Sequence, residues 1–239
     1  MGNGAAAVKR ETGAFDVWRI GLGGVELAAD RAGVLMLEAA YTLIVSDLHL
    51  EKGSSIARRG SFLPPYDTRT TLRRLALAIE RLRPRKVIAL GDSFHDIGGG
   101  ERLASEDRAT LTALQTGRDW IWIAGNHDPE LPAELGGDRA GTWQHGGLTF
   151  RHEPTANHGT EVAGHFHPCA RVSRDGHILR RPCFALGTGR LVIPAFGAYT
   201  GGLNVLDPAC AGLFPIGLAV AVLGRSGVYP VANHQLRPD

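Results

Sequence analysis

Five short polar fragments, each at the end of a strand-like apolar run, hold most of the carboxylates and imidazoles that could do chemistry. The first is Asp47-Leu48-His49, which follows Leu43-Ile44-Val45. Residues two apart in an extended segment point to the same face, so the Asp47 carboxylate and the His49 imidazole leave the strand together. Mixed oxygen and nitrogen donors suit a divalent metal. This pair alone is a weak signal, because Asp-x-His also arises by chance.

Four more fragments follow in order along the chain. They are Gly91-Asp92, Gly125-Asn126-His127-Asp128, His152 and Gly164-His165-Phe166-His167. For any single histidine a structural role is the more common outcome. Five fragments in series, each after a strand-like run, instead indicate ligands that collect at the carboxyl ends of strands.

The elements that must position these fragments alternate between strand and helix in the first half of the chain. Strands are predicted at 41–46, 86–90 and 120–124, after a hairpin within 15–37. One helix is predicted from Asp67, as its N-cap, to Pro84, and another carries Leu103, Leu111 and Leu114 and stops at Gly117. Residues 51–60 are predicted as a basic loop rich in hydroxyls. This order is typical of a parallel α/β sheet.

Glycines and short alternating strands dominate after Pro129, and no strong helix signal appears there. Strands are predicted at 148–151, 161–163, 177–179, 184–186, 191–193 and 228–231. We therefore expect a second, largely antiparallel sheet stacked on the first. The fold class is α/β (α+β), with one domain at 15–239 after a disordered tail at 1–14.

Composition excludes several classes of protein. The chain has 239 residues, with 44% apolar and 21% charged, and no apolar run long enough for a membrane span. The first ten residues lack the apolar core of a signal peptide, which predicts a cytoplasmic protein with no membrane partner. A net charge of +2 is too small to indicate nucleic-acid binding. The widely spaced Cys169, Cys183 and Cys210 favour buried thiols over disulfides or structural zinc.

The ordered fragments resemble the calcineurin-like metallophosphoesterase superfamily, whose pattern is Asp-x-His, Gly-Asp, Gly-Asn-His-Asp/Glu, His and Gly-His-x-His. The resemblance implies a two-sheet β-sandwich flanked by helices, in four layers. Longer stretches are similar to one bacterial subfamily, the phosphoesterase associated with DNA ligase and helicase, a manganese-dependent DNA endonuclease of DNA-damage repair. These stretches are 46–54, 63–68, 91–96 and 194–204.

The resemblance also implies a metal-binding set. Asp47, His49 and His167 would hold one metal, Asn126, His152 and His165 would hold a second, and Asp92 would bridge the two. Two close cations repel strongly unless a shared carboxylate and a hydroxide lie between them. That hydroxide would attack phosphorus in line with the leaving oxygen. Manganese is implied by the resemblance, whereas iron or zinc fits a site without thiolates equally well.

His127 follows a ligand, and the equivalent histidine of the superfamily protonates the leaving alkoxide, a role that suits an imidazole. The frequent Gly-Asp-x-x-Asp has His95 in place of its second aspartate, followed by Asp96. Either Asp96 orients His127, or His95 itself faces the substrate, which is our hypothesis. Arg58 and Arg59 are candidates for binding the phosphate backbone, with a solvated loop as the alternative at even odds.

Two functions stay open from the sequence. The first is a dinuclear phosphodiesterase that cleaves single-stranded or unpaired DNA, and its DNA substrate follows only from the subfamily resemblance. The alternative is a phosphoesterase for a small nucleotide or cyclic nucleotide. A metal-free scaffold is disfavoured, because the chain keeps a full ligand set. The resemblance also implies association with a DNA ligase, a helicase and an exonuclease, and it leaves a homodimer open.

Overall fold

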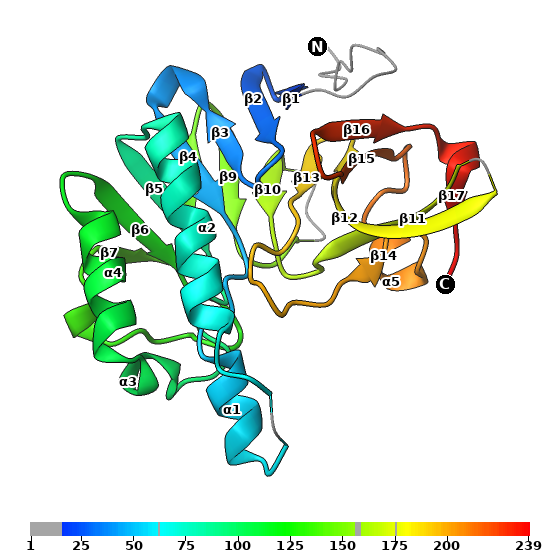
Figure 1. Cartoon of the computed structure of the whole chain (residues 1–239). Helices are drawn as coiled ribbons and strands as arrows, with labels where there is room; N and C mark the ends of the chain where they lie inside the picture. Colours follow the sequence, from blue (N-terminus) through cyan, green and yellow to red (C-terminus); the bar gives the residue numbers. More distant parts are fainter. Residues whose placement is uncertain (1–15, 62, 156–158, 175) are drawn as a thin grey trace.

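The computed structural model describes residues 16–61, 63–155, 159–174 and 176–239. The tail predicted at 1–14 lies outside these residues. Two β-sheets pack face to face, and helices cover the outer face of the first sheet (Figure 1). This is the predicted α/β sandwich, and the fold class is confirmed.

The first sheet has seven strands in chain order. They are β1 (Val17–Leu22), β2 (Val25–Asp30), β3 (Leu35–Leu37), β4 (Thr42–Val45), β5 (Lys86–Leu90), β6 (Asp119–Ile123) and β7 (Asp138–Ala140). Strands β1 to β4 pair antiparallel, and β4 to β7 pair parallel. The carboxyl ends of β4, β5 and β6 therefore meet at one edge of the sheet.

The second sheet has ten strands and is mixed. They are β8 (Trp143–His145), β9 (Leu148–Arg151), β10 (Glu161–Ala163), β11 (Pro168–Arg174), β12 (His177–Gly187), β13 (Arg190–Val192), β14 (Leu203–Asn204), β15 (Ala219–Leu223), β16 (Val228–Val231) and β17 (Leu236–Arg237). Most pairs are antiparallel, but β10 runs parallel to both β9 and β13. The two strands predicted at 177–179 and 184–186 are one strand, whose first half pairs with β11 and whose second half pairs with β13 and β15.

Among the described residues, four helices precede the second sheet, and one short helix lies between its strands. They are α1 (Lys52–Arg58), α2 (Asp67–Leu82), α3 (Gly99–Arg102), α4 (Ser105–Gln115) and α5 (Pro208–Ala211). Single 3-10 turns lie at Glu38–Ala40, Ala133–Leu135 and Asn233–Gln235. The helix predicted to carry Leu103, Leu111 and Leu114 forms instead as two helices, α3 and α4, with Leu103 between them. No helix of the described residues is long and apolar enough to cross a membrane.

The predicted loop at 51–60 is wrong, because its residues form α1. Glycine and serine are poor helix formers, so tertiary contacts decide the conformation. The Glu51 carboxylate accepts hydrogen bonds from Ser54 at 2.6 Å and from Thr68 at 2.9 Å. The Gly53 N–H donates to the Asp67 carboxylate at 3.1 Å. Asp67 therefore binds α1 instead of capping α2, whose N-cap is Tyr66.

Alternating residues of the central strands pack into two separate cores. In β4, Leu43 and Val45 face the helices, whereas Ile44 faces the second sheet. A third core lies on the outer side of the second sheet, against α5, and it encloses Cys183 and Cys210. All three cysteines are buried and free, as predicted. The outer helical layer of the second sheet is reduced to α5 among the described residues.

Candidate metal centre

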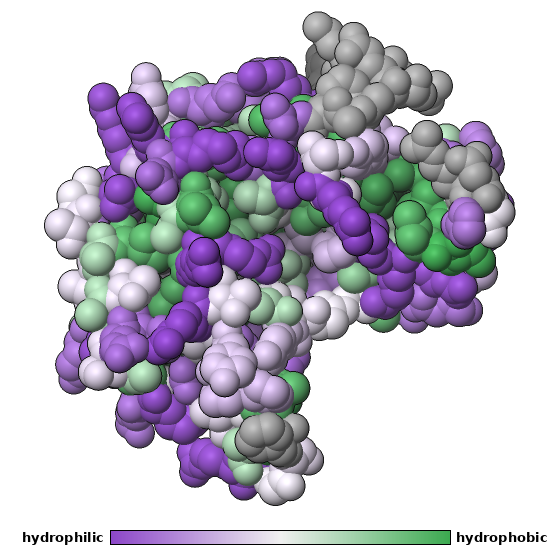
Figure 2. Space-filling view, in the orientation of Figure 1, coloured by the Kyte–Doolittle hydropathy of each residue, from purple (hydrophilic) through white to green (hydrophobic). Residues whose placement is uncertain are grey.

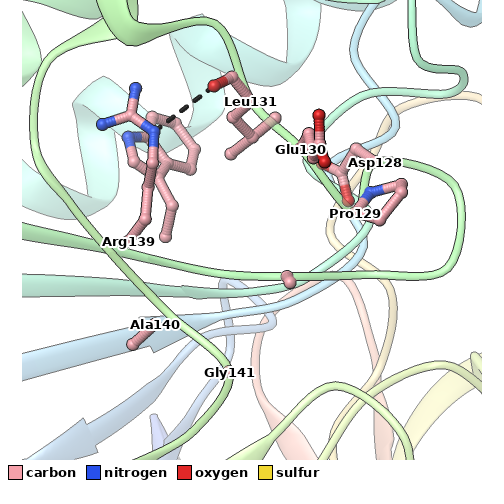
Figure 3. A pocket seen from close by; sticks show the side chains of 9 residues that line it. Asp128, Pro129, Glu130, Leu131, Arg139, Ala140 and Gly141 are labelled. Atoms are coloured by element: carbon pink, nitrogen blue, oxygen red, sulfur yellow. Dashed lines mark hydrogen bonds between the residues drawn. The ribbon is translucent and has the colours of Figure 1, made fainter.

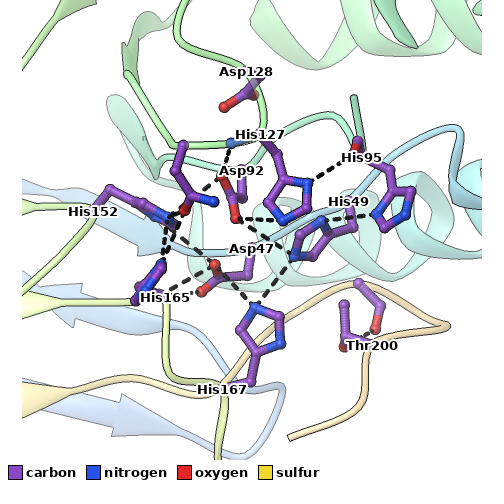
Figure 4. A network of polar contacts seen from close by, with 12 residues as sticks. Asp47, His49, Asp92, His95, His127, Asp128, His152, His165, His167 and Thr200 are labelled. Carbon is purple, nitrogen blue, oxygen red and sulfur yellow. Dashed lines mark hydrogen bonds and ion pairs between the residues drawn. The ribbon is translucent and has the colours of Figure 1, made fainter. Parts of the chain in front are cut away.

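The predicted ligands come together where strands of both sheets end (Figure 4). Asp47 and His49 follow β4, Asp92 follows β5, Asn126 follows β6, His152 follows β9, and His165 and His167 follow β10. The first four residues come from the first sheet, and the three histidines come from the second. Only the packed sandwich brings all seven to one place.

One group of ligands contains Asp47, His49 and His167. The Nε2 atoms of His49 and His167 lie 3.2 Å apart, and His167 Nε2 lies 3.1 Å from an oxygen of Asp47. Burial is the main cause that lowers the pKa of His49 to about 3, against the raising effect of Asp47. A neutral imidazole has a lone pair free for a cation. These three ligand atoms fit one divalent metal.

A second group contains Asn126, His152 and His165. The Asn126 side-chain oxygen lies 2.9 Å from His152 Nε2 and 3.0 Å from His165 Nδ1. His152 donates its Nδ1–H to the Leu90 carbonyl at 2.9 Å, which leaves Nε2 directed at the group. Burial lowers the pKa of His152, but Asp92 and Asp47 outweigh it and raise this pKa to about 9. The negative carboxylates thus favour a positive charge at this position.

Asp92 lies between the two groups. One of its carboxylate oxygens is 3.8 Å from His49 Nε2, and the other is 3.4 Å from His152 Nε2. Burial raises its pKa, but the hydrogen bond and charge of His152 outweigh burial and lower this pKa to about 2. Asp92 is therefore ionised at neutral pH, with one oxygen toward each group. This is the geometry that a bridging carboxylate requires.

The backbone at the ligands is strained. The φ angles of Asp47, His49, Asp92, His165 and His167 are 54°, 41°, 46°, 68° and 45°. Residues with a Cβ rarely adopt this left-handed region, and each costs of order 1–3 kcal/mol when the surrounding structure enforces it. Such strain concentrates at functional sites, because the fold must hold side chains at fixed positions there.

The motif glycines allow close approach at the same edge. Gly91 has a φ of 72°, and a Cβ placed on it would lie 2.5 Å from the His152 ring. A Cβ on Gly164 would lie 1.8 Å from the Ser46 hydroxyl, which donates a hydrogen bond to Asp47 at 2.6 Å. Both glycines are thus needed for the ligands of the two sheets to meet.

His127 lies beside the two groups, with a half-exposed ring. Its Nδ1–H donates to the main-chain carbonyl of His95 at 2.9 Å, and its Nε2 lies 3.9 Å from Asp92. The His95 ring stacks on His127, with ring centres 5.4 Å apart. His95 Nδ1 also lies 3.4 Å from His49 Nδ1, so it can accept the proton of that ligand's second nitrogen. His95 therefore supports both its neighbours.

Asp96 turns away from His127. Its carboxylate accepts a hydrogen bond from Arg102 at 2.7 Å. Although burial opposes it, hydrogen bonds from Ser55 and Arg102 lower the pKa of Asp96. The group that orients His127 is thus a backbone carbonyl, which no side-chain motif could indicate. Arg58 ends α1 and Arg59 follows it, both exposed.

Asp128 ends the fragment Gly125-Asn126-His127-Asp128, but the sequence predicted no role for it. Its carboxylate accepts a hydrogen bond from the Phe94 N–H at 3.0 Å, in the turn that leads from Asp92 to His95. Burial raises its pKa to about 7. It also lines a cavity of about 480 Å³ with Trp122 and Arg139 (Figure 3). Glu153, on the other side of the site, lies 4.0 Å from His165.

The donor set fits a pair of divalent cations. Each group offers imidazole nitrogens and an amide or carboxylate oxygen, with ligand atoms converging and no thiolate among them. Cys183 and Cys210 lie in the core beyond the second sheet. The His and Asp ligand atoms of each group all lie within 4.8 Å of one another, close enough to share one cation.

The sequence was compared with protein families, and residues 41–182 match the calcineurin-like phosphoesterase family, which is more than half of the chain. The chain belongs to this family. It is thus a metal-dependent phosphoesterase, a hydrolase that uses divalent metals. None of the curated protein sequences matches the chain.

Among solved structures, the chain is similar to the Pseudomonas putida nuclease MPE, with a TM-score of 0.70 and 26% identity over 90% of this chain and 100% of that one. The E. coli phosphoesterase Yfce aligns with a TM-score of 0.40 and 14% identity, over 80% of this chain and 98% of that one. The similarity to the nuclease supports placing this phosphoesterase in the nuclease branch of the family.

Proposed function

We propose that this phosphoesterase is a manganese-dependent endonuclease that cleaves single-stranded or unpaired DNA in DNA repair. The observation that carries the proposal is the position of Asp92, with one oxygen toward each ligand group and the His127 ring alongside. A phosphate placed over Asp92 would meet both groups of ligands and the free nitrogen of His127 together.

The divalent cations would supply a hydroxide near neutral pH and neutralise the oxygens of the phosphate. The protein's own residues do the rest. Asp92 lies between the two ligand groups and directs one carboxylate oxygen toward each. The His95 carbonyl accepts the Nδ1–H of His127, so Nε2 is the nitrogen that faces the site, and the imidazolium form of His127 would deliver its Nε2 proton to the leaving oxygen. His49 and His152 are held by contacts on their other nitrogens.

DNA is proposed as the substrate on the similarity to the nuclease from P. putida and on the subfamily stretches of the sequence. Manganese is chosen from the same resemblance, since imidazole, amide and carboxylate ligands also suit iron or zinc. Action in the cytoplasm, alongside a DNA ligase, a helicase and an exonuclease, belongs to this proposal. The alternative substrate is a small nucleotide or cyclic nucleotide.

The test compares substrates with the purified protein in manganese. We expect nicking of a single-stranded DNA circle at a kcat/KM well above that for cyclic nucleotides or small mono- and diesters. Efficient hydrolysis of small esters with no nicking would favour the alternative. Replacing manganese by iron or zinc, with the bound metal measured in each case, decides which cation supports the reaction.

A further inference from the structure

The start of helix α1 lies beside His95. The segment that leads into α1 pairs with the His95 segment, through a bridge between Leu50 and Phe94 and a hydrogen bond from the His95 N–H to the Leu50 carbonyl at 2.9 Å. Lys52, the first residue of α1, is therefore two residues beyond the pairing partner of His95. In Figure 1, α1 projects from the helical layer at this end of the molecule.

Polar contacts hold α1 in this position. Arg102 joins it to the next segment, because its guanidinium donates to Ser54 at 3.0 Å and to Asp96 at 2.7 Å. At the other end of the helix, Arg58 Nη1 lies 3.8 Å from where a Cβ of Gly98 would be. Both ends of α1 thus lie along residues 95–98. Asp96 is already paired with Arg102, so its charge is largely satisfied.

Basic residues stand at both ends of α1, with Lys52 as its first residue, Arg58 as its last and Arg59 as its C-cap. The His95 pKa is lowered chiefly by burial, and the positive charges of Lys52 and Arg59 lower it further. Lys52 is half-buried and Arg59 is exposed. Figure 2 shows hydrophilic residues at the projecting end of the molecule that α1 forms. The positive charges of Lys52 and Arg59 thus lie close enough to act on His95, whose other neighbours are His127 and the ligand His49.

The position of His127 relates Lys52 and Arg59 to the bond that is cleaved. In the proposed mechanism the leaving oxygen lies at His127 Nε2, and the His95 ring stacks on His127 with an interplanar angle of 22°. His95 thus contacts both His127 and the ligand His49, and the segment that leads to Lys52 pairs with the backbone of His95. A strand that continues beyond its leaving oxygen would run toward His95, with its next phosphate near Lys52 and Arg59.

We propose that Lys52 and Arg59 bind the phosphate next to the scissile one on the leaving-group side, and so make the enzyme selective for polymers over small esters. The inference rests on the proposed nuclease function. A small ester or a cyclic nucleotide has no such second phosphate. Two charge-assisted contacts to a phosphate then stabilise only a longer strand.

The test uses a single-stranded oligodeoxynucleotide with one scissile position and an uncharged methylphosphonate at a neighbouring phosphate. The end groups of the products identify the leaving oxygen, and hence the leaving-group side. The variants are Lys52→Gln, Arg59→Gln and the double variant. Arg225→Gln, in the turn between β15 and β16, is a control that removes the same charge elsewhere.

For the unaltered enzyme, we expect a methylphosphonate on the leaving-group side to lower kcat/KM by about tenfold or more, the loss of one charged contact. The double variant should lose a similar factor on the all-phosphate strand, and the methylphosphonate should then cost little more, because both changes remove one interaction. Selectivity for the oligonucleotide over a small diester should fall by the same factor, and Arg225→Gln should keep it.

The assignment of Lys52 and Arg59 would be wrong if the losses caused by the double variant and by the methylphosphonate multiplied independently. It would also be wrong if the double variant were coupled only to the phosphate on the other side of the scissile one. In both cases the enzyme would still nick DNA. A wild-type enzyme that hydrolyses small diesters but no oligonucleotide would remove the DNA function, and this inference with it. The two failures are thus distinguished by whether the unmodified strand is cut.

Discussion

The ring of His127 donates a hydrogen bond through Nδ1 to the main-chain carbonyl of His95, over 2.9 Å. A carbonyl can only accept a hydrogen bond, so this contact places a proton on Nδ1 and leaves Nε2 as the nitrogen on the side of Asp92, 3.9 Å from its carboxylate. A backbone group thus does what a carboxylate would do at the same place.

Replacing His127 by alanine tests its role in protonating the leaving oxygen. We expect kcat on DNA to fall by about 10²–10⁴-fold, the usual contribution of a general acid. A bis(p-nitrophenyl) phosphate substrate should lose much less, because its phenolate leaves without a proton. An equal loss on both substrates would mean that His127 does not act on the leaving group.

Replacing His95 by alanine keeps the carbonyl and removes only the ring. His127 should stay oriented, so we expect kcat to change by the same factor for substrates with good and with poor leaving groups. The ring lies 3.4 Å from His49 Nδ1, and losing such an outer partner typically lowers metal affinity by about 10–100-fold. Manganese titration measures this affinity. Unchanged turnover of both mono- and diesters would contradict the hypothesis that His95 faces the substrate.

Two glycines with positive φ offer a matched pair. The φ angles of Gly91 and Gly60 are 72° and 82°, but only at Gly91 does an added Cβ meet the His152 ring, at 2.5 Å. Gly60→Ala should destabilise the fold by about 1 kcal/mol through its backbone conformation alone. Gly91→Ala should cost clearly more and weaken metal binding. Unfolding by urea compares the two, and similar losses would show that close approach to His152 is unimportant.

Removing metal should destabilise the protein. Five ligands have positive φ angles, and converging imidazoles and carboxylates favour a cation in the folded state only. Manganese at 100 times its dissociation constant would add about 2.7 kcal/mol to the free energy of unfolding. Thermal melts with manganese and with chelator measure the change. A Tm that is the same in both, for protein shown to bind manganese, would contradict this coupling.

The sequence alone was enough to single out the residues that gather at the strand ends and the central strands β4, β5 and β6, because each signal is local. Asp47 and His49 follow an apolar run that no helix pattern explains, and β4, β5 and β6 are short and apolar throughout. The motif order then indicated the family. The division of the ligands into two groups agrees with the distances in the structure, although each residue's role in binding metal stays a prediction.

What could not be predicted depends on contacts between distant segments. Helix α1 contains Gly53 and two serines, and it forms because Glu51 and Asp67 bind across to α2 and to α1 itself. The strands predicted at 177–179 and 184–186 form one strand, β12, which changes its pairing partner between Pro182 and Cys183. The carbonyl of His95 belongs to the backbone, so its role could be seen only in the folded structure.

The central claim is that Asp92 joins two metal sites into one catalytic centre. The most direct measurement is manganese-supported nicking of single-stranded DNA by the wild type and by Asp92→Asn, with bound metal counted in both. We predict two metals and nicking for the wild type, and for Asp92→Asn a lower metal content with a loss of more than about 100-fold, beyond the usual effect of an outer partner. Equal nicking by the two proteins would contradict the mechanism.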